Sequence, residues 1–224
     1  KWGIPAEIPY GSPFDISAIL TRPFNTARDR IPLVLKRDEN ANLDKAFARA
    51  QQAVEQGRVD DAIAIFRELL VNDPDSGVIH AALGTLLIGK EEYEKARDSL
   101  IKALKAMPSE TGLCLQLADV CLQLNEHGNA RQILEAVLGR EPLNVNVIAR
   151  LVDALVASGQ TPEAVEKVKN ALVEDPKNPD LIAIFGHLAA VIGNRDALGT
   201  CIEKLRETDP SHPGVEKLVD LEPH

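Results

Sequence analysis

The chain has 224 residues, of which 45% are hydrophobic and 26% charged, and its formal net charge is −9. This composition excludes a mostly disordered chain, and no stretch approaches the roughly 18–20 consecutive apolar residues that a membrane span requires. An acidic chain repels phosphate backbones, which argues against nucleic acid as a partner. Aromatic residues make up only 4% of the chain, so the abundant Ala, Leu and Val predict closely packed helices.

Residues 1–42 differ in composition from the rest of the chain. They contain five of the fourteen prolines and carry a net charge of +1, whereas the remaining residues carry −10. Proline at this density prevents long helices and favours extended structure and turns. The same stretch holds four aromatic side chains that we interpret as docking anchors: Trp2, Tyr10, Phe14 and Phe24. The sequence leaves open whether this arm packs on its own repeats, docks on another chain or is disordered.

The chain begins with Lys1-Trp2 rather than Met, so we expect that a preceding segment was removed. A signal peptide, a membrane anchor and an arbitrary cloning boundary all fit, because no residual signal sequence remains to decide. The compartment therefore stays open between the cytoplasm and an exported, periplasmic location. Three cysteines do not make a closed disulfide framework, and we expect them to be small buried thiols.

A fixed period organises the second part of the sequence. Five prolines follow one another at steps of 34 residues: Pro74, Pro108, Pro142, Pro176 and Pro210. Because proline ends helices, a helix is expected to end once in every period. Small residues keep the same period, twelve positions before each of the first four prolines: Ala62, Ala96, Ala130 and Ala164, with Leu198 before the fifth. Such positions are typical of two helices that approach closely.

This pattern resembles the tetratricopeptide repeat, whose signature combines small and large apolar residues at fixed offsets and ends in proline. The second repeat carries the best match, with Leu83-Gly84, Ala96 and Pro108. The resemblance implies an all-α fold, a right-handed α-solenoid of five helix-turn-helix repeats preceded by the extended arm of residues 1–42. The repeats are placed at residues 43–76, 77–110, 111–144, 145–178 and 179–212, and residues 213–224 are expected to form a short capping helix and tail.

In proteins of this family the first helices of successive repeats line a concave groove, which implies a partner-binding surface here. The resemblance places these residues on it: Phe47, Gln51, Thr85, Gln116, Asp119, Asn146, Arg150, Asp153 and His187. Only Arg150 among them is basic, which disfavours the clamp for a C-terminal carboxylate that the family is known for. We instead expect an extended or helical segment with apolar anchors, with a basic residue facing Asp119 or Asp153.

One stretch matches the G-x-x-x-x-G-K pattern of a phosphate-binding loop, from Gly84 to Lys90. Glu91 replaces the hydroxyl residue that would hold magnesium, and the stretch falls within a predicted helix instead of between a strand and a helix. The histidines and cysteines lack the spacing of metal ligands, and no nucleophile with its base can be recognised. The sequence therefore predicts a non-enzymatic protein without a cofactor or metal.

The predicted function is a protein–protein interaction scaffold or assembly subunit that binds a partner protein or peptide through the groove, the arm or both. The alternative is a self-assembling structural protein, a homo-oligomer in which the arm docks on a neighbouring copy. A repeat region fused to a separate regulatory or catalytic domain is a third hypothesis, although the arm is too short to be that domain.

Overall fold

The computed structural model describes residues 37–221, with side chains described from residue 43. The predicted arm anchors Trp2, Tyr10, Phe14 and Phe24 lie outside the described residues. Within residues 37–221 the structure contains eleven α-helices and no strand, so the predicted all-α fold is confirmed. The helices are α2 (Arg37–Glu55), α3 (Val59–Asn72), α4 (Gly77–Gly89), α5 (Tyr93–Ala106), α6 (Thr111–Gln123), α7 (His127–Leu138), α8 (Val145–Ala157), α9 (Thr161–Glu174), α10 (Pro179–Val191), α11 (Arg195–Thr208) and α12 (Gly214–Val219).

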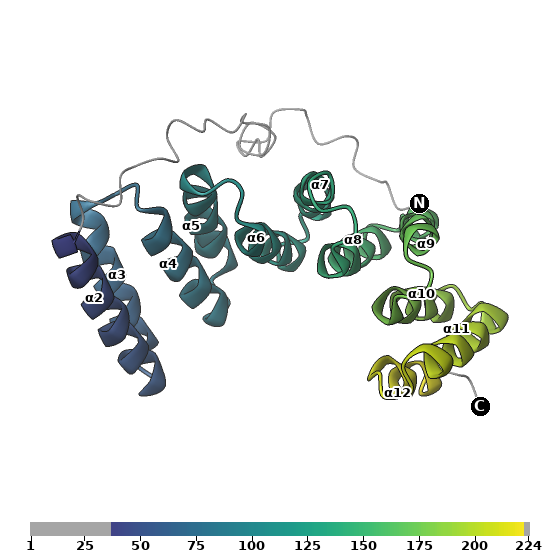
Figure 1. The fold of residues 1–224 in the computed structure, drawn as a ribbon. Helices are drawn as coiled ribbons and strands as arrows, with labels where there is room; N and C mark the ends of the chain where they lie inside the picture. Colours follow the sequence, from purple (N-terminus) through teal and green to yellow (C-terminus); the bar gives the residue numbers. More distant parts are fainter. Residues whose placement is uncertain (1–36, 222–224) are drawn as a thin grey trace, which may run out of the picture. The chain divides into compact units, whose positions relative to one another are not determined.

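The helices divide into two compact units, with the boundary between Val120 and Cys121 inside α6. In the first unit, α2 packs against α3, α3 against α4, and α4 against α5. Figure 1 shows α2 and α3 lying side by side along their lengths. One core of this unit combines three alanines with two larger apolar residues: Ala50, Ala53, Ala62, Phe66 and Ile79. Small residues on α2 thus let a larger ring fill the space between the helices.

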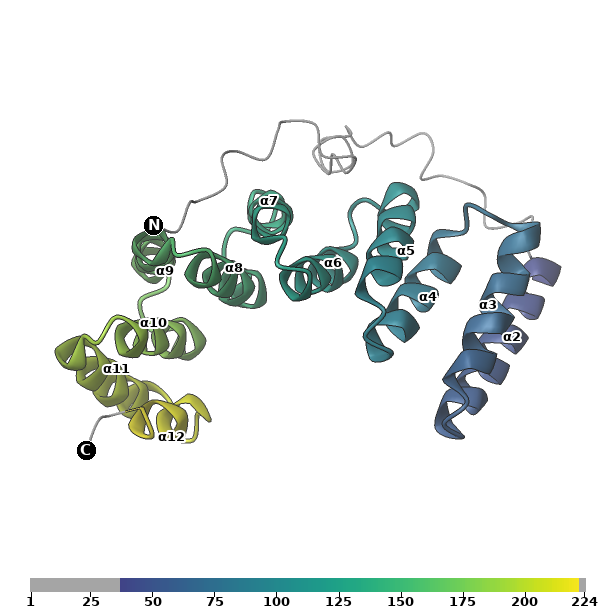
Figure 2. The same ribbon diagram turned by 180° about the vertical axis from the view of Figure 1, so that it is seen from behind.

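The second unit continues the same arrangement. Here α7 packs against α8, α8 against α9, α9 against α10, and α10 against α11. The short helix α12 packs against both α10 and α11, as Figure 2 shows from behind. Leu218 on α12 is 2% exposed and joins a core with Ile182, Ala189 and Leu205. The predicted C-terminal capping helix is therefore present and covers the apolar side of the last helix pair.

Small residues mark the places where paired helices approach each other. Ala62, Ala96, Ala130 and Ala164 are fully buried. On α4, a Cβ atom placed at Gly84 would lie only 2.9 Å from Cγ and Cδ2 of Leu100 on α5. The periodic small positions of the sequence are therefore the close contacts of the fold.

The turn between the two helices of a pair also repeats with the 34-residue period. One residue of each turn has a positive φ, from 59° to 77°: Gly57, Glu91, Asn125, Gly159 and Gly193. Glycine adopts this backbone conformation without steric cost, and other residues do so at a cost. Each helix that follows such a turn ends two to four residues before a periodic proline, as α5 does at Ala106 before Pro108.

The three cysteines Cys114, Cys121 and Cys201 are buried and are not in disulfide bonds. Burial raises the pKa of the Cys201 thiol, which keeps it in the unreactive protonated form. None of the helices within residues 37–221 is long and apolar enough to cross a membrane.

Candidate functional site

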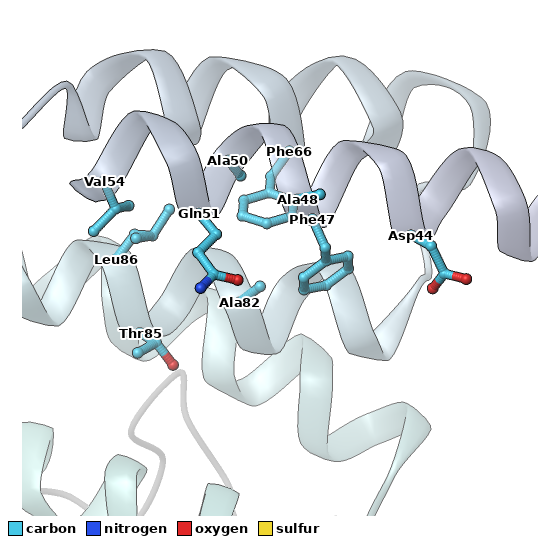
Figure 3. A pocket seen from close by; sticks show the side chains of 10 residues that line it. All are labelled: Asp44, Phe47, Ala48, Ala50, Gln51, Val54, Phe66, Ala82, Thr85 and Leu86. Atoms are coloured by element: carbon cyan, nitrogen blue, oxygen red, sulfur yellow. The ribbon is translucent and has the colours of Figure 1, made fainter. Parts of the chain in front are cut away.

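A cavity of about 540 Å³ opens on the surface of the first unit, between α2 and α4 with α3 behind them. Figure 3 shows the side chains that line it. Four of them follow one face of α2 at helical spacing: Asp44, Phe47, Gln51 and Val54. Phe66 comes from α3, and α4 contributes Ala82, Thr85 and Leu86. This volume lies within the roughly 300–1,000 Å³ that is usual for ligand-binding pockets.

The floor of this α2–α4 cavity is apolar. The rings of Phe47 and Phe66 meet edge to face, with their centroids 4.8 Å apart and their planes at 61°. Phe66 is 3% exposed and belongs to the core, whereas Val54 is 39% exposed. Phe47 and Leu86 are half-buried. Apolar surface therefore continues from the core of the unit to the solvent at this point, which leaves contact area for a partner to cover.

Polar side chains surround the floor and are held in place by hydrogen bonds. The Thr85 hydroxyl donates to the carbonyl of Ala81 at 3.1 Å and accepts from Nε2 of Gln116 on α6 at 3.3 Å. Nε2 of Gln51 donates to the carboxylate of Glu55 at 3.1 Å. Asp44 adds an exposed carboxylate at the other end of the cavity. Among the described residues that line the cavity, none is Lys, Arg or His, so its surroundings favour an apolar group accompanied by positive charge.

A second cavity, of about 340 Å³, lies in the second unit between α8, α10 and α12. Its lining mixes polar side chains with apolar ones, and the polar ones include Asp153 from α8, His187 from α10 and Lys217 from α12. At its edge, His212 lies with Nε2 at 3.0 Å from Oδ1 of Asp180. Carboxylates and basic groups therefore lie side by side in this cavity, and its charges favour neither a positively nor a negatively charged ligand.

The structure brings together some of the residues expected in the groove. Phe47, Gln51 and Thr85 line the α2–α4 cavity, and Gln116 contacts it through Thr85. Asp153 and His187 line the second cavity.

Other expected residues line neither cavity. Asn146 and Arg150 lie one turn apart on α8, where Nη1 of Arg150 donates to the Asn146 carbonyl at 3.3 Å. Asp119 lies on α6 and also lines neither cavity.

Sequence reasoning missed several lining residues. Asp44 and Val54 share the helical face of Phe47 and Gln51, because they stand three residues before Phe47 and three after Gln51. That spacing could have identified both. Lys217 had no such signal, because its place in the second cavity depends on how α12 packs against α10.

The stretch that resembles a phosphate-binding loop has another role. Gly84 lies inside α4 against Leu100, and Lys90 follows the C-terminal end of that helix. The Lys90 ammonium pairs with Asp60 on α3 and lies 3.1 Å from Glu92, and its hydrogen bond to Asp60 raises its pKa. Helix C-termini present carbonyl oxygens, which repel phosphate. In the part of the chain that the structure describes, no group of His, Cys, Asp or Glu is arranged to hold a metal ion.

The family assignment follows from the sequence matches. A family model described as "Tetratricopeptide repeat" matches residues 53–109, 87–153 and 122–184, which together cover more than half of the chain. The chain belongs to the tetratricopeptide repeat family. Tetratricopeptide repeat protein 28 of Mus musculus is 24% identical over 170 residues, which covers 70% of this chain but 7% of that protein. Tetratricopeptide repeat protein 21B of Homo sapiens is 26% identical over 151 residues, which covers 59% of this chain and 11% of that protein. The chain thus spans about a tenth or less of the length of these relatives.

Solved structures of tetratricopeptide repeat proteins have a similar fold. MamA of Desulfovibrio magneticus RS-1, from residue 41 to its end, superposes with a TM-score of 0.63 at 18% identity, covering 77% of this chain and 97% of that one. YrrB, described as a TPR protein with an unusual peptide-binding site, superposes with a TM-score of 0.57 at 20% identity. The match covers 76% of this chain and 88% of YrrB. The family and the fold support a general role in protein interaction.

Proposed function

We propose that this tetratricopeptide repeat chain is a non-enzymatic scaffold that holds a segment of another protein in the α2–α4 cavity. The observation that carries the proposal is the apolar part of the cavity lining, in which buried Phe66 contacts Phe47 and to which exposed Val54 also belongs. A mostly apolar pocket with a few polar side chains around it is typical of a binding site.

The lining defines the chemistry of the segment. Phe47, Val54 and Leu86 favour one large apolar side chain as the anchor of the partner segment. The exposed carboxylate of Asp44 favours a basic residue beside that anchor. Gln51 and Thr85 supply polar side chains for hydrogen bonds to the backbone or side chains of the partner segment. The proposed partner is therefore a protein segment with a large apolar residue next to Lys or Arg.

The comparisons support this proposal at the level of the fold. Members of this family are typically scaffolds without enzymatic activity, and the structurally similar YrrB is described as having a peptide-binding site. Binding of a partner segment does not require any side chain to make or break a covalent bond. Among the residues that line the two described cavities we recognise no nucleophile with an adjacent general base.

Two threonine variants test the proposal. Thr85 and Thr200 are both exposed helical threonines whose hydroxyls donate to the carbonyl four residues earlier, at 3.1 Å and 2.8 Å. Thr85 lines the cavity, whereas Thr200 on α11 lines neither cavity. Thr85→Arg introduces bulk and positive charge where the partner is proposed to bind.

The measurement is quantitative co-purification of partners from the native host, with circular dichroism as the check on folding. We expect T85R to reduce recovery of a specific partner at least tenfold and T200R to leave it unchanged. Equal recovery with both variants would overturn the proposal.

A further inference from the structure

The last helix, α12, is attached to α10 through a histidine that lies between α11 and α12. We propose that His212 is a pH-sensitive switch: its neutral ring holds α12 against α10, and its protonation at mildly acidic pH releases α12. The release removes the wall that Lys217 and Leu218 of α12 contribute to the second cavity. The inference concerns the second unit and is independent of the function proposed for the α2–α4 cavity.

Both ring nitrogens of His212 take part in hydrogen bonds. Nδ1 accepts from the backbone N–H of Gly214, the first residue of α12, at 3.0 Å. Nε2 lies 3.0 Å from Oδ1 of Asp180 on α10. Because a nitrogen that accepts carries no proton and a carboxylate oxygen only accepts, this arrangement requires the neutral ring with its proton on Nε2. The His212 side chain is 13% exposed, so most of it is shielded from water.

A second proton on the ring is incompatible with this arrangement. The start of α12 is closely packed, because a Cβ atom at buried Gly214 would lie 2.7 Å from Nδ1 of His212 and 2.9 Å from Cβ of Ala183 on α10. Protonation at Nδ1 places an N–H against the N–H of Gly214, so their hydrogen bond is lost. A buried N–H that loses its acceptor destabilises the fold.

The pairing with Asp180 does not compensate for this loss. Protonation strengthens the contact between Nε2 of His212 and the Asp180 carboxylate, but the Asp180 side chain is 61% exposed, and exposed ion pairs contribute little. The docked position of α12 therefore disfavours the second proton, and lowering the pH shifts the equilibrium towards the released position. Histidine ordinarily gains this proton between about pH 8 and about pH 5.

The other charged and titratable groups near His212 have smaller effects. Asp209 at the end of α11 accepts hydrogen bonds from the backbone N–H and the hydroxyl of Ser211. Lys217, His187 and Asp153 line the same cavity from α12, α10 and α8. Lys217 opposes a further positive charge and Asp153 favours one, but both side chains are exposed and therefore screened.

The two preceding repeats have asparagine at the position of His212, at Asn144 and Asn178. Their side-chain oxygens accept from the backbone N–H three residues later, at 3.3 Å and 3.2 Å. Nδ2 of Asn178 also donates to Asp175, three residues earlier, and Asp209 stands three residues before His212. Because an amide does not titrate in this range, His212→Asn replaces the switch with the pH-independent arrangement of the repeats.

Thiol labelling of the full-length chain at about pH 7.5 and about pH 5 tests the switch. Cys201 on α11 is 5% exposed and shares a core with Leu218 of α12, so release of α12 uncovers its thiol. The probe is a pyridyl disulfide, which reacts with thiols at both pH values, and mass spectrometry identifies the labelled cysteine. The variants are His212→Asn and, as the matched control, His187→Asn from the same cavity.

At about pH 5 we expect Cys201 to be labelled at least about fivefold faster in the unsubstituted chain and in H187N than in H212N. At about pH 7.5 the three rates should be equal. Comparing the three proteins at one pH removes the effect of pH on the labelling chemistry itself. Equal rates for H212N and the unsubstituted chain at about pH 5, or a slow rate in H187N, would overturn the assignment to His212.

Hydrogen exchange distinguishes release of α12 from unfolding of the whole second unit. At about pH 5, amides of residues 214–221 should lose protection in the unsubstituted chain relative to H212N, whereas amides of α8 should remain equally protected in both. Equal protection of residues 214–221 in the two proteins would overturn the switch. An equal loss of protection in α8 and α12 would also overturn it, because the pH response would then belong to the whole unit.

Discussion

Arg131 on α7 and Glu163 on α9 form a bidentate ion pair across two helices that are separated in sequence by α8. Nη1 and Nη2 of Arg131 donate to the two carboxylate oxygens of Glu163 at 2.9 Å and 2.7 Å. Nε of Arg131 also donates to Glu135 at 3.2 Å, and Glu135 accepts from Lys167 at 3.4 Å. The four side chains thus connect the second helices of two consecutive pairs within the second unit.

Replacing Arg131 with lysine tests this connection. Arg131→Lys keeps the charge but removes the planar fork that makes two parallel hydrogen bonds. Both side chains of the pair are about a third exposed, so we expect a loss of only about 0.5–1 kcal/mol in the free energy of unfolding. Urea unfolding of the variant checks this, with Arg67→Lys on the exposed face of α3 as the control. If the urea midpoint of Arg131→Lys equals that of Arg67→Lys, the Arg131–Glu163 pair does not contribute to the free energy of unfolding.

Gly84 is required by the close approach of α4 to α5. Gly84→Val would drive its methyl groups into Leu100, and overpacking of this kind costs roughly 1–3 kcal/mol. The matched variant is Gly199→Val on α11, where a Cβ atom would meet nothing within 4 Å. Thermal unfolding should show a lower midpoint for Gly84→Val and little change for Gly199→Val. Similar midpoints would contradict the close contact.

Glu91 occupies a turn position where the equivalent residues Gly57, Gly159 and Gly193 are glycine, and its φ is 59°. Because a side chain in this conformation costs roughly 1–2 kcal/mol, and glycine gains entropy on unfolding, we predict that Glu91→Gly stabilises the chain by up to about 1 kcal/mol. The reverse change, Gly159→Glu, should destabilise it by a similar amount. Chemical denaturation measures the change in the free energy of unfolding for each variant. We expect an increase for Glu91→Gly and a decrease for Gly159→Glu, and changes of the same sign would contradict the prediction.

Much of this fold could be predicted because its main constraints are local and repeat with one period. Proline is not tolerated beyond the first turn of a helix, so Pro108 marks a helix end, and alanine at position 96 permits close packing whatever the partner helix is. The Arg131–Glu163 pair could not be predicted in this way. Its geometry depends on the distance between α7 and α9, which is set by how each of them packs against α8. No local sequence pattern encodes that distance.

The ion pairs around Glu92 make a pH-dependent contribution to stability. Nζ of Lys95 donates to Glu92 at 2.6 Å, and Nζ of Lys90 lies 3.1 Å away. These hydrogen bonds, first from Lys95 and then from Lys90, hold the pKa of Glu92 below its ordinary value of 4.5. A lowered folded-state pKa stabilises the fold above the unfolded pKa, and this stabilisation is lost as the pH falls through the folded pKa.

We therefore predict that Glu92→Gln reduces the loss of thermal stability between about pH 6 and about pH 3. Melting temperatures of the two proteins at both pH values check this. High salt should narrow the difference, because the groups are near the surface and salt screens them. Parallel pH dependence in the two proteins would show that Glu92 does not contribute.

The candidate site was predictable only in part, for a physical reason. Phe47, Gln51 and Thr85 were identified because the family resemblance assigns faces to the first helix of each repeat. Whether those faces enclose a cavity depends on neighbouring side chains such as Val54 and Leu86, whose exposure results from how α2 and α4 each pack against α3. Sequence therefore indicates the helices of a binding surface but not where on them a cavity opens.

The most direct test of the binding role is site-specific photo-cross-linking in the native host. A photoreactive residue replaces Ala48 in the cavity or, as the matched control, the exposed Ala64 on α3. The account predicts a specific partner adduct at position 48, mapping to a segment with a large apolar residue beside Lys or Arg, and no such adduct at position 64. Adducts of the same kind and yield at both positions, or none at position 48, would contradict the proposal that the α2–α4 cavity binds a partner protein.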